Sequence, residues 1–166
     1  MARKVSLVLS HWYHLVEGLQ ESPQSFYSAL EQSIEKRNLP NAKISRITYK
    51  ESGIFSSKRE YLRVSRKEHL FDVCAAPFGN GFFVSWWLAL APGAALETTS
   101  RIPIIGPMFF NLFKPATYFA HDTALMFQES IRTAVNEVID GNTQAKGLRM
   151  MSELERKPIL SNLFQQ

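Results

Sequence analysis

Apolar residues recur at three- and four-residue steps in the first part of the chain. This spacing over residues 5 to 20 predicts an amphipathic helix, although Gly18 weakens its end and its start also suits a short strand. The positions that form this stripe are Val5, Val8, Leu9, Trp12, Leu15, Val16 and Leu19. A second helix is predicted to begin at Ser22 and Pro23, which suit the N-cap and first helical positions, and to stop at Asn38.

The middle of the chain changes to a period of two, which is typical of strands. Strands are predicted at residues 43–51, 60–65, 69–76 and 82–90. Between the last two lies Pro77-Phe78-Gly79-Asn80-Gly81, whose Gly and Asn residues tolerate the positive φ of a tight hairpin. These last two strands are apolar on both faces. They should be central strands of a sheet that is either covered on two sides, or covered on one side and bound to something on the other.

The last part of the chain predicts a long connection followed by a long helix. Residues 94–116 contain three prolines, and a structureless stretch of this length usually has a function or reflects a wrong assignment. The helix is predicted from Thr117 as its cap to Asp140, with Gly141 just past its end. The fold class is therefore α+β, a four-stranded antiparallel meander with two N-terminal helices and one long C-terminal helix packed on it. Residues 1–146 should form a single domain, and residues 147–166 a basic and apolar tail that docks on the body or on a partner.

Length, cysteine content and the N-terminus restrict the class of protein. The chain has 166 residues, 45% apolar and 20% charged, which suits one globular domain and excludes collagen, coiled coils and overall disorder. The single cysteine, Cys74, excludes a fold framed by internal disulfides. The apolar run Val5–Leu9 is shorter than a signal-peptide core, so we expect a cytoplasmic protein, with peripheral membrane association as a further expectation.

The sequence offers no convincing catalytic or metal motif, and we expect no metal and no cofactor. His11 and His14 would lie one helical turn apart, but a zinc site needs further ligands that the sequence does not place nearby. Cys74 lies among small apolar residues and is interpreted as core. Asp72 shares that strand, and Arg63 on the neighbouring strand is its predicted ion-pair partner. An enzyme would need an unrecognised site in which Asp72, His121 and Asp122 converge.

Positive charge is concentrated in the middle of the chain. Residues 43–67 hold eight basic and two acidic side chains, a charge of +6, although the whole chain carries only +4. The candidate basic surface comprises Lys58, Arg59, Arg63, Arg66 and Lys67. Three interpretations stay open: a nucleic-acid surface helped by neighbouring aromatic residues, contact with anionic lipid headgroups, and a solvated sheet edge whose lysines deter aggregation.

The most specific signal is a pair of apolar runs, residues 82–91 and 102–113, each too short and the second too interrupted by proline to span a membrane. The second run is either core beneath the long helix or an exposed docking segment. Its candidate docking residues are Ile104, Ile105, Met108, Phe109, Phe110, Leu112 and Phe113. The leading hypothesis is a non-catalytic adaptor or assembly protein that docks through this loop on another protein or a membrane surface. The alternatives are a nucleic-acid-binding module that uses residues 43–67 and an enzyme. A homo-oligomer is a further possible arrangement.

Overall fold

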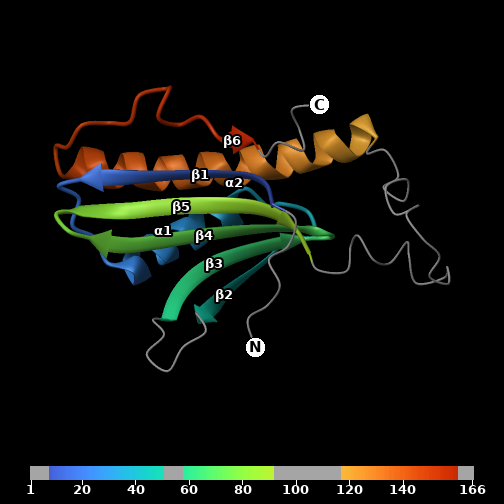
Figure 1. Ribbon diagram of the computed structural model, residues 1–166, viewed down its shortest axis with the longest axis horizontal. Coiled ribbons are helices and arrows are strands. Elements are labelled where there is room, and N and C mark those ends of the chain that lie inside the picture. Colours follow the sequence, from blue (N-terminus) through green and yellow to red (C-terminus); the bar gives the residue numbers. More distant parts are fainter. Residues whose placement is uncertain (1–7, 51–57, 92–116, 161–166) are drawn as a thin grey trace, which may run out of the picture.

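A computed structural model gives the fold, and it describes residues 8–50, 58–91 and 117–160 (Figure 1). The elements in chain order are β1 (Val8–Glu17), α1 (Pro23–Lys36), β2 (Lys43–Lys50), β3 (Lys58–Arg66), β4 (His69–Phe78), β5 (Gly81–Leu90), α2 (Tyr118–Ala145) and β6 (Ile159–Leu160). The predicted α+β class with an antiparallel sheet is confirmed.

The sheet has six strands in the order β2-β3-β4-β5-β1-β6, rather than the four predicted. The predicted meander is present as β2 to β5, and its last hairpin turns at Gly79, whose φ is +59°. The two extra strands come from the ends of the described chain. β1 pairs along its length with β5, and β6 pairs with β1 at only two positions.

The prediction of a helix over residues 5–20 was wrong, because residues 8–17 form β1. Here Trp12 and Val16 point into the core, whereas Tyr13 and Leu15 on the opposite face remain substantially exposed. A strand with apolar residues on both faces shows no clean alternation, so its spacing matched a helical period by coincidence. Hydrogen bonding with β5 makes this segment a strand rather than a helix. The described residues therefore contain two helices, not three.

Both predicted helix caps are confirmed. Ser22 Oγ accepts a hydrogen bond from Ser25 N at the start of α1, and Thr117 Oγ1 accepts one from Ala120 N at the start of α2. However, α2 continues past Gly141 to Ala145. It ends instead where Gly147 adopts a φ of +64°, a conformation that costs glycine little.

Both helices cover the same face of the sheet, as Figure 1 shows. The core between the two layers is built from alternate residues of the central strands, including the completely buried Phe71, Phe82 and Trp86. Tyr27 of α1 ties the layers together, since its hydroxyl accepts from Ala75 N and donates to Glu60 O, both at 2.9 Å. Burial raises the pKa of this phenol. No helix in the described part of the chain is long and apolar enough to cross a membrane.

His69 is a buried titratable group in this core, and it predicts a dependence of stability on pH. Its side chain packs near Phe127, its Nδ1 has no hydrogen-bond partner among the described residues, and burial lowers its pKa. As pH falls below about 6.5, the unfolded chain takes up a proton that the folded chain resists, so the free energy of unfolding should decrease. Each unit of pKa difference is worth about 1.4 kcal/mol at low pH.

We therefore expect His69→Gln to flatten the curve of unfolding free energy against pH between neutrality and pH 4, as measured by urea denaturation. His14, whose pKa burial also lowers, should retain part of the dependence. The same change at His11, on the opposite face of the sheet, is the control. An unchanged slope in His69→Gln would contradict the prediction.

Candidate functional site

One face of the sheet carries no helix in the described part of the chain, and we call it the outer face. Trp86 and Trp87 show the difference between the two faces, because Trp86 is completely buried under the helices and Trp87 is 39% exposed on the outer face. The alternation and register of β1 to β5 assign to this face His11, Tyr13, Leu15, Tyr49, Arg59, Tyr61, Arg63, Leu70, Asp72, Cys74, Ala76, Phe83, Ser85 and Trp87. The sequence predicted that β4 and β5, which are apolar on both faces, would be central strands. It predicted that the sheet would be either covered on two sides, or covered on one side and bound to something on the other.

Aromatic rings pair across neighbouring strands on the outer face. His11 stacks on Trp87 with ring centroids 4.8 Å apart, and Tyr13 lies against Phe83 at 6.5 Å. Such pairs contribute beyond the area they bury and hold the rings in fixed positions. The outer face is thus an ordered apolar surface rather than a set of mobile side chains.

The predicted ion pair between Arg63 and Asp72 is confirmed, and it lies at the centre of the outer face. Arg63 donates from Nε and Nη2 to the two carboxylate oxygens, each at 2.7 Å, and both side chains are only 13% exposed. Tyr49 Oη joins them, 2.6 Å from Arg63 Nη2 and 3.1 Å from Asp72 Oδ2. Hydrogen bonding to Asp72 raises the pKa of Arg63, and burial raises the pKa of Tyr49. Arg63 already donates from two of its nitrogens to Asp72, so its guanidinium is not a free cation that could bind a phosphate.

The remaining candidate basic residues lie at two opposite ends of the sheet. Arg66 ends β3 and Lys67 lies in the β3–β4 turn, at the end of the sheet where β5 finishes, and Lys43 of β2 lies there too. Lys58 and Arg59 begin β3 at the other end, near the β4–β5 turn. The fold therefore places the candidate basic residues at two opposite ends of the sheet, although the sequence suggested that they form one basic surface.

Large exposed apolar residues lie at the same end of the sheet as Lys43, Arg66 and Lys67. The backbone of Ala91 bonds to Glu68 O, and α2 begins at the same end of the sheet, with Tyr118 90% and Phe119 77% exposed. The chain thus leaves this end after Ala91 and returns to it at Thr117. We call this region, with Lys43, Arg66, Lys67, Tyr118 and Phe119, the loop end.

A small cavity of about 200 Å³ lies at the loop end beneath α2. Its lining consists of Leu9, Ser10, Leu88, His121, Ala124, Leu125, Gln128 and Leu160. The wall is mainly apolar, and the buried Ser10 hydroxyl donates to Gln128 Oε1 across it. Its volume is below the roughly 300–1,000 Å³ of typical small-molecule sites, so it is not a strong substrate pocket.

The residues that the sequence suggested as candidate metal ligands do not lie close together. His11 and His14 are three residues apart on a strand, which directs their side chains to opposite faces. His11 stacks on Trp87, and His14 lies close to Glu155 and Arg149. Within the described ranges, no group of three or more His, Cys, Asp or Glu residues is positioned to hold a metal ion.

The three residues of the enzyme hypothesis lie on two sides of the sheet. Asp72 is bound to Arg63 and Tyr49 on the outer face, whereas His121 lines the cavity on the helix side. Asp122 follows His121 on α2. Cys74 is 1% exposed, and burial raises the pKa of its thiol, which favours the unreactive protonated form.

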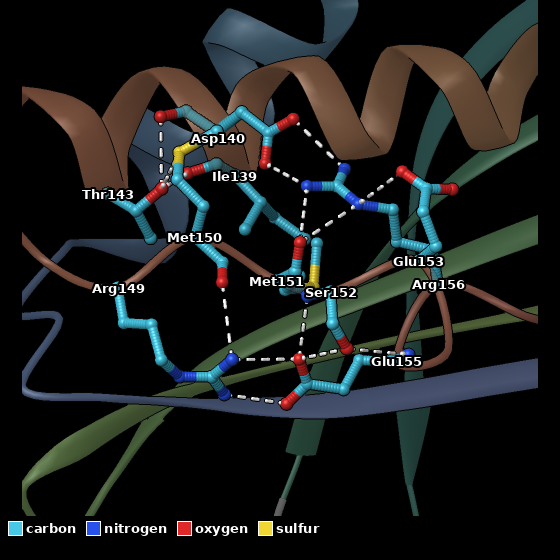
Figure 2. Close-up of polar contacts among 10 residues, drawn as sticks. All are labelled: Ile139, Asp140, Thr143, Arg149, Met150, Met151, Ser152, Glu153, Glu155 and Arg156. Atoms are coloured by element: carbon cyan, nitrogen blue, oxygen red, sulfur yellow. Dashed lines mark hydrogen bonds and ion pairs between the residues drawn. The ribbon is translucent and has the colours of Figure 1, made fainter.

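Sequence analysis missed a polar cluster that fixes the segment after α2 to the body (Figure 2). Arg156 donates to both carboxylate oxygens of Asp140 at 3.0 and 2.9 Å, and also to Met151 O. Arg149 and Ser152 both bind the carboxylate of Glu155, and these bonds lower its pKa. Trp12 Nε1 donates to Glu155 O. Trp12 and Glu155 are 143 residues apart, so no local spacing indicates that contact. Ser152 and Glu155, in contrast, lie three residues apart, which is the spacing of a capping box and was a local signal.

The candidate docking residues Ile104, Ile105, Met108, Phe109, Phe110, Leu112 and Phe113 lie outside the described residues. Docking through this segment therefore stays a prediction. Comparison of the chain with protein-family models, with curated proteins and with solved structures finds no match.

Proposed function

We propose that this protein is a non-catalytic interaction protein whose loop end docks at an anionic membrane surface. The observation that carries the proposal is the position of the loop end: β5 ends and α2 begins at the end of the sheet that holds Lys43, Arg66 and Lys67, and the apolar segment 102–113 lies between these two elements in the sequence. Tyr118 and Phe119 lie exposed at the same end.

The chemistry of the loop end supports a lipid partner. Basic side chains near an anionic leaflet contribute about 1 kcal/mol each. Aromatic side chains favour the boundary between headgroups and acyl chains, where Tyr118 can keep its hydroxyl hydrated. Glu68 lies in the same turn as Lys67 and offsets part of the charge, so the cations alone give weak attraction. Stable attachment would need the apolar contribution of residues 102–113.

Vesicle flotation tests this proposal with a matched pair of variants. The wild-type protein should float with vesicles that contain phosphatidylserine and should remain with the unbound fraction when the vesicles are purely zwitterionic. Combining Arg66→Glu with Lys67→Glu should weaken binding at least about 30-fold, since two attractive charges are lost and two repulsive ones are added. Combining Lys58→Glu with Arg59→Glu changes the net charge equally at the opposite end of the sheet and should have little effect.

Two outcomes would overturn the membrane assignment. One is a wild-type protein that stays unbound on both kinds of vesicle. The other is equal weakening by the two charge variants, which would indicate a general effect of net charge. Phe109→Ser with Phe110→Ser extends the experiment, because it should abolish flotation without unfolding if that segment is the docking element.

The nucleic-acid alternative receives less support from the fold. Asp72 binds Arg63, and Arg46 is bound by Glu31 and Glu60, so two of the eight basic residues in the segment 43–67 have carboxylate partners. Phosphate binding depends on cations that are free to release counterions.

A further inference from the structure

The cavity beneath α2 at the loop end, which we call the α2 cavity, has the chemistry of a hydrocarbon site. Its apolar lining comes from both layers of the fold. These residues are Leu9 of β1, Leu88 of β5, Ala124 and Leu125 of α2, and Leu160 of β6. We infer that the α2 cavity binds the end of a single acyl chain, supplied either by a membrane lipid or by a free fatty acid.

The polar residues of the lining already have partners. Ser10 and Gln128 are 2% and 3% exposed, and the Ser10 hydroxyl donates to Gln128 Oε1. His121 also takes part in an interaction of its own. Because a water molecule in a protein cavity needs two to four polar partners, this wall favours an apolar occupant. The lining formed by the described residues contains no lysine or arginine, so the head of a lipid would remain outside.

The volume fits the end of a chain rather than a whole ligand. An apolar cavity of about 150 Å³ binds benzene, so the 200 Å³ or so of the α2 cavity accommodates roughly six to eight carbons. Leu125 and Leu160 are 50% and 44% exposed, so the cavity opens to the surface beside them. The rest of a longer chain can continue there over the exposed side chains of Met126 and Ile159.

One wall of the α2 cavity can move without disturbing the rest of the sheet. Leu160 belongs to β6, which is two residues long and pairs with β1 at only two positions. So short an edge strand has few backbone hydrogen bonds to lose, and such elements open at low cost in free energy. A chain can therefore enter by displacing Leu160 while α2 and the central strands keep their positions.

The α2 cavity lies where the proposed docking would bring acyl chains close to the protein. Ser10 pairs with Leu88 two residues before β5 ends, and His121 follows Tyr118 by three residues on α2. A lipid chain that enters the cavity would add apolar contact to the weak attraction of the cations. A membrane source of the chain rests on the proposed function, whereas binding of a free fatty acid does not.

Two tryptophans can report on the α2 cavity. Trp12 and Trp86 pair across β1 and β5, and each lies two residues, or about 7 Å, along its strand from Ser10 or Leu88. Both indoles are buried on the helix side, whereas Trp87, the third tryptophan, lies on the outer face. Bromine quenches indole fluorescence only at short range. In a Trp87→Phe protein, a chain with a brominated end should therefore quench fluorescence when it occupies the cavity.

Fluorescence titration of the Trp87→Phe protein with dodecanoic acid brominated on its last carbon tests the inference. We expect saturable quenching below the concentration at which the acid forms micelles. Adding Ala124→Leu should weaken binding at least about tenfold, because it fills space for two or more methylenes that are each worth about fourfold in affinity. Ala42→Leu makes the same change in the other hollow, of about 190 Å³ beside the end of α1, and should leave binding unchanged.

A second variant keeps the test valid if Ala124→Leu fails to fold. Leu160→Asp places a charge in the cavity wall at a half-exposed position, so it should weaken binding by a similar factor while the fold is retained. Circular dichroism would confirm that each variant is folded. Absence of saturable quenching in the Trp87→Phe protein would overturn the inference. Quenching that both cavity variants leave unchanged would do so as well.

Vesicles distinguish the two sources of the chain. They contain phosphatidylserine and a phosphatidylcholine that is brominated near the ends of its acyl chains. Quenching by these vesicles that Ala124→Leu removes assigns the site to a membrane lipid, whereas quenching by the free acid alone assigns it to fatty acids. A protein that floats with vesicles but is quenched by neither probe would lose the cavity site and keep the docking proposal. A protein that binds the free acid without floating would show the reverse.

Discussion

Replacing Trp86 with alanine should destabilise the protein by about 3–5 kcal/mol, the range measured for large aromatic residues removed from well-packed cores. Trp86 is the largest side chain that is completely buried, and it stacks on Phe71 with ring centroids 5.0 Å apart. A cavity of that size beneath α2 cannot be filled by small shifts, because both layers that enclose it are held by hydrogen-bonded elements. Since a domain is typically stable by only 5–15 kcal/mol, the variant should be close to unfolding at room temperature. Urea denaturation followed by circular dichroism measures the loss.

The adjacent tryptophan provides the matched control. Trp87→Ala removes the same side chain from the same strand but from the outer face, where Trp87 is 39% exposed. We expect a loss of about 1 kcal/mol, largely from the stacking contact with His11. Equal losses at the two positions would contradict the difference in burial between Trp86 and Trp87.

Replacing Asp140 with alanine should cost about 2–3 kcal/mol, because it removes the carboxylate from a largely buried guanidinium. Arg156 is 14% exposed and donates to both oxygens of Asp140. Without that carboxylate, Arg156 either stays buried and unpaired or pulls its segment into solvent. In the second case, residues 148–160 should exchange their amide hydrogens faster than the sheet does, as hydrogen–deuterium exchange with mass spectrometry would show.

Glu153 serves as the control for this cluster. It lies 4.0 Å from Arg156 but is 97% exposed, so the pair is a surface contact that contributes little. Glu153→Ala should leave both stability and exchange close to those of the wild-type protein. If Asp140→Ala behaved like Glu153→Ala, the ion pair would not be what fixes the segment after α2.

The separation of the basic residues follows from one property of the fold. Antiparallel strands return the chain to each end of the sheet in turn, so residues close in sequence are separated in space. Lys58 and Arg59 are separated from Arg66 and Lys67 by the length of β3. The sheet then has Arg66 and Lys67 at one end and Lys58 and Arg59 at the other, and the ion pair of Arg63 with Asp72 lies on its outer face.

Local patterns predicted most of the elements between residues 22 and 90. Ser22 and Pro23 begin α1, the period of two marks β3, and Gly79 with Asn80 forms the turn between β4 and β5. These signals are reliable because each depends on the conformational limits of the residues themselves. The pairing of Arg63 with Asp72 was also predictable, since a half-buried carboxylate needs a partner and the adjacent strand offered one.

Tertiary context decided the rest. The spacing of residues 8–17 favoured a helix, yet β1 forms because β5 supplies backbone partners along its length. Gly141 resembles a helix end, yet α2 continues through it, since the glycine that adopts positive φ is Gly147. The contacts of Trp12 with Glu155 and of Asp140 with Arg156 gave no signal in the sequence, because residues that far apart leave no periodic trace.

The sequence by itself determined the α+β class, the meander, both helix starts and the two-sided apolar character of β4 and β5, because these depend on the intrinsic preferences of neighbouring residues. Only the tertiary structure decided that β1 is a strand, that α2 continues to Ala145, and that the basic segment is divided between opposite ends of the sheet. The physical reason is that pairing and layer packing are long-range choices, made by the free energy of the whole fold rather than by any local stretch of chain.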